Sequence, residues 1–127
     1  MVIDITSGVQ QTLSTTLSQS PTSQYASGQF QLADGLLAWE ESDATSAAIK
    51  VFDGTTVTTV SSRLSGRLYG TGGGYVLFGE DSKLYVWSTA GGKQLLLDTT
   101  PGVARISGKT VYFTNGAQQA LYSVTLN

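Results

Sequence analysis

A chain of 127 residues is long enough for one domain with its own hydrophobic core. Only 13% of its residues are charged and the formal net charge is −2, so the sequence lacks the concentrated basic field that nucleic-acid binding requires. Histidine and cysteine are both absent, which excludes disulfides, thiolate metal sites and every mechanism built on a Ser-His or Cys-His pair.

The N-terminal part, residues 1–28, is polar and rich in Ser, Thr and Gln. Within it, Val2–Ile5 has the pattern of a short strand and Gln11–Ser14 that of a second one. The chain start shows neither the basic stretch nor the apolar run of a signal peptide, and no segment approaches the roughly 20 apolar residues of a membrane helix. The sequence therefore predicts no membrane insertion.

Residues 29–127 contain about three copies of one four-stranded unit. Each copy has a linking strand, a strand with an aromatic anchor, a second aromatic strand and, in the first two copies, an outer strand. The anchors are Trp39, Phe78 and Phe113. The expected strands are Gln29–Leu32, Gly35–Glu41, Ile49–Phe52, Val57–Val60, Arg67–Tyr69, Gly74–Glu80, Leu84–Trp87, Leu95–Asp98, Ala104–Ile106, Lys109–Asn115 and Leu121–Val124.

Turn signals separate these strands. Asp-Gly and Asn-Gly pairs supply the positive φ that tight two-residue hairpins demand. The signals are Asp34-Gly35, Asp53-Gly54, Gly91-Gly92, Ser107-Gly108 and Asn115-Gly116. The glycine-rich run Gly70–Gly74 lies between two strands and does not open a helix, so it predicts a turn or bulge and not a phosphate loop.

The anchor strands are apolar on both faces. Leu36–Trp39, Tyr75–Phe78 and Leu84–Trp87 lack the alternation that a strand with one wet face shows. Such strands need cover on both sides, which small sheets stacked face to face provide in a β-propeller. The sequence therefore predicts a single all-β domain, residues 1–127, of about three four-stranded antiparallel blades that form a partial ring or one completed by a second copy. A β-sandwich is the alternative.

The first full repeat carries a resemblance to a known family. Leu37-Ala38-Trp39-Glu40-Glu41, followed after a short loop by Ile49–Thr56, resembles the TolB-like β-propeller repeats of bacterial secreted and envelope proteins. The resemblance covers about residues 29–127 and implies a surface for binding or scaffolding. The second repeat departs from the pattern at Gly79 and Ser88, and the third stops after its aromatic strand.

Two groups of carboxylates are the candidates for a metal or acid–base site. Glu40, Glu41 and Asp43 crowd one expected hairpin, and Glu80-Asp81 occupies the equivalent place one repeat later. Glu41, Asp43, Glu80 and Asp81 are the calcium candidates, because oxygen-rich loops hold that ion. Their spacing matches no calcium loop, so the favoured interpretation is solvated hairpin tips that keep the sheet edges soluble.

Aromatic residues recur at equivalent positions of the repeats, which favours a core between blades over a sugar-binding platform. The recurring set is Trp39, Phe52, Tyr75, Phe78, Trp87, Tyr112 and Phe113. Tyr25, Tyr69 and Tyr122 fit this periodicity less well and are the ligand candidates.

The repeats, the missing histidine and the lightly charged surface favour a non-catalytic interaction or scaffold module of a larger secreted or cell-surface bacterial protein. Such a module needs no catalytic residue, metal or cofactor, and its partner is a protein or a glycan. A glycan-binding module is the alternative, and a polysaccharide hydrolase or lyase that works with Glu, Asp, Tyr and Lys is the third hypothesis. Three repeats fall short of the about four blades of the smallest common propellers. A homodimer closed through blade contacts is therefore one expected assembly, and an open fragment is the other.

Overall fold

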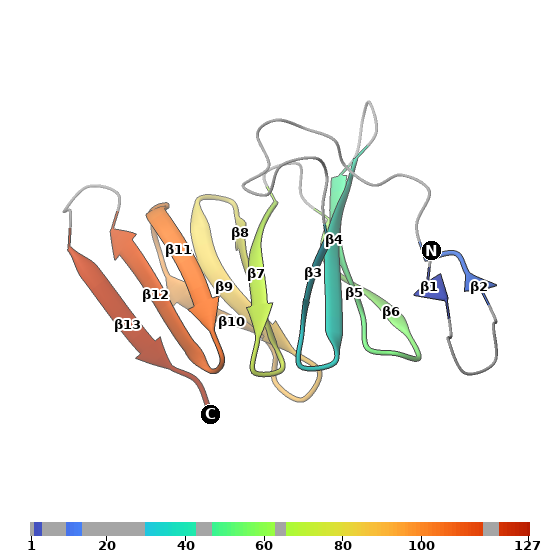
Figure 1. Ribbon diagram of the computed structural model, residues 1–127. Coiled ribbons are helices and arrows are strands. Elements are labelled where there is room, and N and C mark those ends of the chain that lie inside the picture. The colour runs from blue at the N-terminus through green and yellow to red at the C-terminus, as the bar shows by residue number, and fades with distance from the viewer. Residues whose placement is uncertain (1, 4–9, 14–29, 43–46, 63–65, 116–119) are drawn as a thin grey trace.

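The computed structural model describes residues 2–3, 10–13, 30–42, 47–62, 66–115 and 120–127 (Figure 1). Every regular element in these ranges is a β-strand, and none of the described residues forms a helix able to cross a membrane. Tyr25, Asp43 and Gly116 lie outside the described residues. The predicted all-β fold with repeated antiparallel sheets is confirmed.

Three consecutive sheets form the body of the molecule, and in each of them the strands lie in chain order. The first sheet comprises β3 (Phe30–Ala33), β4 (Leu36–Ser42), β5 (Ala47–Phe52) and β6 (Val57–Ser61). The second comprises β7 (Arg67–Gly72), β8 (Tyr75–Glu80), β9 (Lys83–Ser88) and β10 (Gly92–Leu97). The third comprises β11 (Pro101–Ser107), β12 (Thr110–Asn115) and β13 (Leu121–Thr125). A small hairpin of β1 (Val2–Ile3) and β2 (Gln10–Gln11) precedes them.

The repeat alignment holds at the level of register. The anchors Trp39, Phe78 and Phe113 lie on the second strand of their sheets and pair with Lys50, Tyr85 and Tyr122 on the third strand. The three sheets are therefore structural copies of one unit, and equivalent residues point toward equivalent faces.

The sheets stack through their first strands. β7 contacts β3 and β4 on one side and β11 on the other, and Figure 1 shows the sheets following one another in an open row. β8 of the middle sheet is thus covered on both faces, as its apolar pattern predicted. Each fully buried Val, Leu or Phe side chain contributes roughly 1.5–3 kcal/mol to this packing.

Two core clusters lie on opposite faces of the middle sheet. Val76 and Phe78 of β8 point toward the first sheet, whereas Leu77 between them points toward the third. The cluster between the first and second sheets contains Leu36, Ala38, Ile49, Val51, Leu68, Val76 and Phe78. The cluster between the second and third sheets contains Tyr69, Leu77, Leu84, Val86, Ala104, Val111, Phe113 and Leu126.

Of the aromatic set expected in the core between sheets, Phe78 and Phe113 are buried in the two clusters, and Tyr75 and Trp87 pack against them partly buried. Trp39 and Phe52 are buried, although neither belongs to the two clusters, but Tyr112 is 44% exposed. Tyr112 occupies the position of Leu77, which the third sheet covers. No fourth sheet lies over the equivalent face in the described residues, so the expectation of a buried Tyr112 is wrong.

The hairpins between the first and second strands contact each other along one rim. The Gly73 amide donates a hydrogen bond of 2.5 Å to Asp34 Oδ2, which joins the β7–β8 turn to the β3–β4 turn. Gly73 has φ +58°, and a Cβ there would lie 2.6 Å from the Gly108 carbonyl oxygen at the start of the β11–β12 turn. Glycine is required because the neighbouring hairpin touches its backbone.

Candidate functional site

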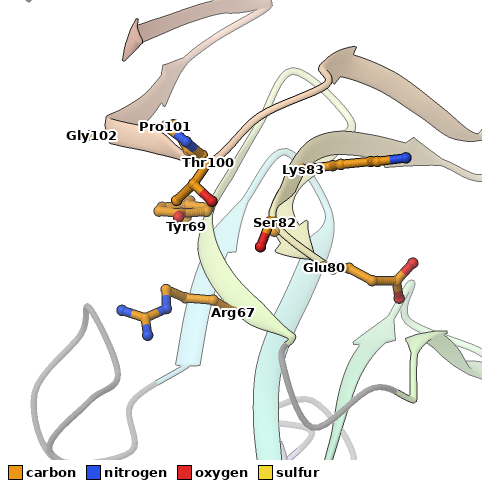
Figure 2. Close-up of a pocket in the computed structure, with 9 residues that line it drawn as sticks. Arg67, Tyr69, Glu80, Ser82, Lys83, Thr100, Pro101 and Gly102 are labelled. Atoms are coloured by element: carbon orange, nitrogen blue, oxygen red, sulfur yellow. The ribbon is translucent and has the colours of Figure 1, made fainter. Parts of the chain in front are cut away.

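A cavity of about 340 Å³ opens between the second and third sheets, at the end opposite the contacting hairpins. Its walls come from the start of β7, the end of β8, the β8–β9 turn and the residues that enter β11. The lining residues are Arg67, Tyr69, Gly79, Glu80, Ser82, Lys83, Thr100, Pro101 and Gly102 (Figure 2). Of the three tyrosines singled out from the sequence, Tyr69 is the one placed here.

A β-bulge positions Tyr69. The register of β7 against β8 shifts between Leu68 and Gly70, so the residue between them has no partner on β8. Its ring lies over Gly79, where a Cβ would come within 3.0 Å of Tyr69 Cε2. The side chain is 8% exposed and belongs to the core cluster between the second and third sheets. Tyr69 is therefore a core residue with one edge on the cavity.

The phenol of Tyr69 stays protonated at neutral pH. Burial raises its pKa, and the nearby positive charge of Arg67 opposes this shift only in part. The hydroxyl is therefore available as a hydrogen-bond donor and not as a phenolate base.

The charged groups around the cavity diverge. Figure 2 shows the Arg67 side chain and the Lys83 side chain extending to opposite sides, with the Glu80 carboxylate turned away from Tyr69. Lys83 Nζ lies 3.2 Å from Asp98 Oδ1, and this hydrogen-bonded ion pair raises the pKa of Lys83. The cavity therefore offers polar edges for binding rather than acid and base groups aimed at one point.

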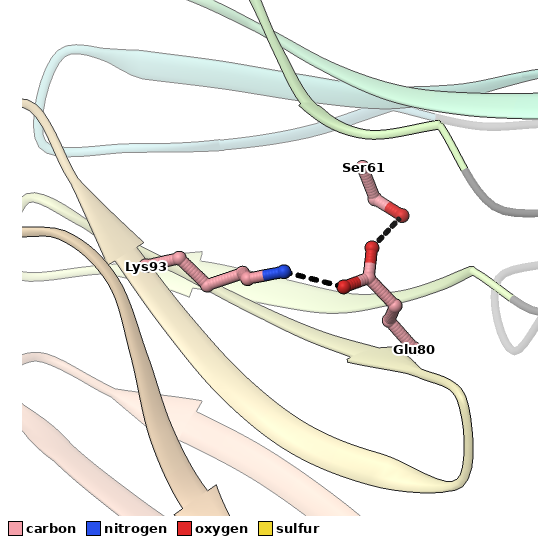
Figure 3. A network of polar contacts seen from close by, with 3 residues as sticks. All are labelled: Ser61, Glu80 and Lys93. Atoms are coloured by element: carbon pink, nitrogen blue, oxygen red, sulfur yellow. Dashed lines mark hydrogen bonds and ion pairs between the residues drawn. The ribbon is translucent and has the colours of Figure 1, made fainter.

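Glu80 joins the first sheet to the second (Figure 3). Ser61 Oγ, at the end of β6, donates a hydrogen bond of 2.6 Å to Glu80 Oε2, and Lys93 Nζ of β10 lies 2.5 Å from Oε1. Glu80 is 6% exposed, so the expectation of a solvated hairpin tip is wrong for this residue. Ser61 and Lys93 lie against its two oxygens.

Glu80 is ionised within this network. Burial alone raises its pKa, but the hydrogen bonds from Lys93 and Ser61, with the charge of Lys93, outweigh burial and leave the pKa below its ordinary value. Lys93 Nζ also sits 4.7 Å from the centroid of the Tyr85 ring, a cation–π contact that holds the ammonium in place.

The remaining carboxylate candidates make other contacts. Glu40 Oε2 accepts a 2.6 Å hydrogen bond from the Leu68 amide, a second tie between the first and second sheets. Glu41 accepts a 2.8 Å bond from Trp39 Nε1 and lies 3.3 Å from Lys50 Nζ. Asp81 is exposed in the β8–β9 turn. Across the described ranges, no three acidic side chains gather where they could hold a metal ion, so Glu41, Glu80 and Asp81 do not form a common site.

Tyr122 lies apart from the cavity. It is 42% exposed on β13 and stacks on Phe113, with ring centroids 5.6 Å apart. The structure therefore does not bring Tyr69 and Tyr122 together at one site, and Tyr25 is outside the described residues.

Sequence reasoning did not single out Arg67, Ser82, Lys83 or Thr100 as cavity residues. They come from different strands and turns, and only the stacking of two sheets brings them together. Gly70, a glycine within an apolar strand, was the one usable signal, since such a residue marks a bulge that redirects its neighbour.

No family model matches the chain, and comparison with the curated proteins and with the solved structures gives no match either. The TolB-like resemblance therefore stays a prediction from the residues.

Proposed function

We propose that this chain is a non-catalytic interaction and scaffold module. The observation that carries the proposal is the use of its carboxylates. Glu40 and Glu80, which acid–base chemistry would need in a cleft, accept hydrogen bonds across the junction of the first and second sheets. Side chains committed in this way stabilise a rigid stack whose surface is free to bind a partner.

A carboxylate-based hydrolase requires a different arrangement. Glycosidases place two carboxyl groups about 5–10 Å apart on either side of the scissile bond. Among the described residues that line the cavity, Glu80 is the one acid, and its two oxygens are engaged by Ser61 and Lys93. We therefore propose that the cavity binds a ligand and does not catalyse its hydrolysis.

The wider setting follows from the repeat pattern. The resemblance to TolB-like repeats supports a place within a larger secreted or cell-surface bacterial protein, and the low share of charged residues suits that setting. The expected partner is a protein.

Release of reducing ends from a panel of polysaccharides tests the non-catalytic role, with wild type and Glu80→Gln compared side by side. We expect no release above the blank from either protein. Release by the wild type that is lost in a Glu80→Gln variant of unchanged fold would contradict the proposal.

Glycan binding is the second candidate, because the cavity combines an aromatic edge with hydrogen-bonding groups. Tyr69 supplies the edge, and Arg67, Ser82 and Thr100 supply donors and acceptors. A glycan array with wild type and Arg67→Ala separates this candidate from the first. A bound glycan whose affinity falls about tenfold or more in Arg67→Ala would favour it, whereas an array without a ligand removes it. Arg67 is exposed, so the variant should keep its fold.

A further inference from the structure

The exposed large apolar side chains gather at the two ends of the stack. Of the eight such residues in the described ranges, six lie on the outward faces of the first and third sheets. The head face is the outward face of the first sheet, with Phe30, Leu32 and Val57 exposed. The tail face is the outward face of the third sheet, with Val103, Tyr112 and Leu121 exposed.

Cross-strand register assigns the head face. Phe30 pairs with Trp39 and Leu32 pairs with Leu37, and paired residues share a face. That face is opposite the one on which Leu36 and Ala38 contact the second sheet. Phe30 is 55% exposed and Leu32 is 67% exposed, which is unusual for large apolar residues on a sheet face.

The tail face is assigned in the same way. Tyr112 pairs with Arg105 on one side and with Ser123 on the other, and Leu121 pairs with Thr114. This face is opposite the one on which Val111 and Phe113 contact the second sheet. Leu121 is 72% exposed.

Each end face corresponds, position by position, to a face that is buried inside the chain. On the tail face, Tyr112 takes the place of Leu77, which faces the next sheet. On the head face, Phe30 takes the place of Leu68, which is buried against the preceding sheet. Trp39 and Phe52 on this face are already buried, so Phe30, Leu32 and Val57 are its exposed part. The contact between consecutive sheets in the chain is thus a template for a contact between a tail face and a head face.

We propose that the tail face of one copy of this chain packs on the head face of a second copy and continues the stack. Both junctions between the three described sheets already use this pairing, so the occupant that fits each end face is the opposite end of the same chain. The contact is head-to-tail, and two such contacts related by a twofold axis close a ring. Two copies supply six sheets, within the range of four to eight blades in common propellers, whereas three copies would supply about nine.

Light scattering coupled to size-exclusion chromatography tests the proposal with three variants of equal charge. Leu32→Glu places a carboxylate on the head face and Leu121→Glu places one on the tail face. Leu95→Glu is the matched control, because Leu95 is 52% exposed on the outer strand of the middle sheet and lies on neither end face. All three sites are exposed, so the melting temperature of each variant checks that its fold is kept.

We expect wild type and Leu95→Glu to run at twice the chain mass of 13.3 kDa. Leu32→Glu and Leu121→Glu should each weaken association about thirty-fold or more, because a carboxylate replaces an apolar contact of the interface, and run as monomers. An equimolar mixture of these two variants retains one intact junction and should again form a species of twice the chain mass.

Three results would overturn the proposal. The first is a wild type that stays at 13.3 kDa over the whole accessible concentration range. The second is a Leu121→Glu or Leu32→Glu variant that dimerises as well as wild type. That result would mean that the unmutated face pairs with the same face of a second copy and that the contact is not head-to-tail. The third is a mixture of the two variants that remains monomeric.

Discussion

Replacing Phe78 by alanine removes the aromatic anchor of the middle sheet. The ring is 0% exposed and lies in the core between the first and second sheets, stacked on Tyr85 with centroids 5.5 Å apart. Emptying a buried aromatic site costs about 3–5 kcal/mol in the free energy of unfolding. A domain of this kind has about 5–15 kcal/mol in total, so we expect Phe78→Ala to lose roughly a third of its stability.

Urea unfolding followed by tryptophan fluorescence measures this loss, because Trp87 packs against the same cluster. Phe30→Ala is the matched control, since it removes the same atoms from a side chain that is 55% exposed. It should change the free energy of unfolding by about 0.5 kcal/mol or less at a protein concentration at which the chain is monomeric. If Phe78→Ala loses no more than Phe30→Ala, Phe78 does not lie between two sheets and the stacking is wrong.

Three further results are expected. In urea unfolding, Gly73→Ala should lower the free energy of unfolding by more than Gly35→Ala. Both glycines have positive φ, but a Cβ at position 73 would lie 2.6 Å from the backbone of the next hairpin, whereas a Cβ at position 35 would meet open space. Equal losses would refute the contact between hairpins. The lowered folded-state pKa of Glu80 means that its contribution to stability is present above the unfolded pKa of about 4.3 and is lost as the pH falls through the folded value. Urea titrations at neutral and acid pH should therefore show a smaller acid loss in Glu80→Gln than in wild type, and identical losses would contradict the ionised network. Millimolar calcium should leave the melting temperature unchanged, whereas a site filled at a hundredfold excess over its Kd would add about 2.7 kcal/mol, and a clear rise would restore the calcium candidates.

Strands with strong apolar patterns could be predicted from the sequence. β4, β8 and β9 are apolar on both faces, and their registers match the alignment of the three anchors. The outer strand of the second sheet was predicted at Leu95–Asp98, whereas β10 spans Gly92–Leu97. Its start could not be predicted, because Lys93, Gln94 and Leu95 are all exposed and a strand exposed on both faces shows no alternation of apolar and polar residues. A hairpin was expected at Glu80-Asp81, but the positive φ of Asp81 and Ser82 was not, since no glycine signals it.

The site could not be predicted, because stacking decides it. Glu80 and Asp81 are adjacent in the sequence, yet the end of β6 covers Glu80 while Asp81 is exposed. Tyr69 fits the repeat pattern less well and was therefore a ligand candidate, whereas a bulge turns it into the core. These outcomes depend on which sheet lies next to which, and a single strand pattern does not contain that information.

Nuclear Overhauser contacts between methyl groups test the stacking of the three sheets most directly. Val76 should show contacts with Ile49 and Val51 of the first sheet, and Val86 should show contacts with Val111 of the third, because each pair shares a core cluster. Val51 and Val111 should show none, since the middle sheet lies between them. A contact between Val51 and Val111 would place the first and third sheets face to face, as in a sandwich, and would contradict the stack.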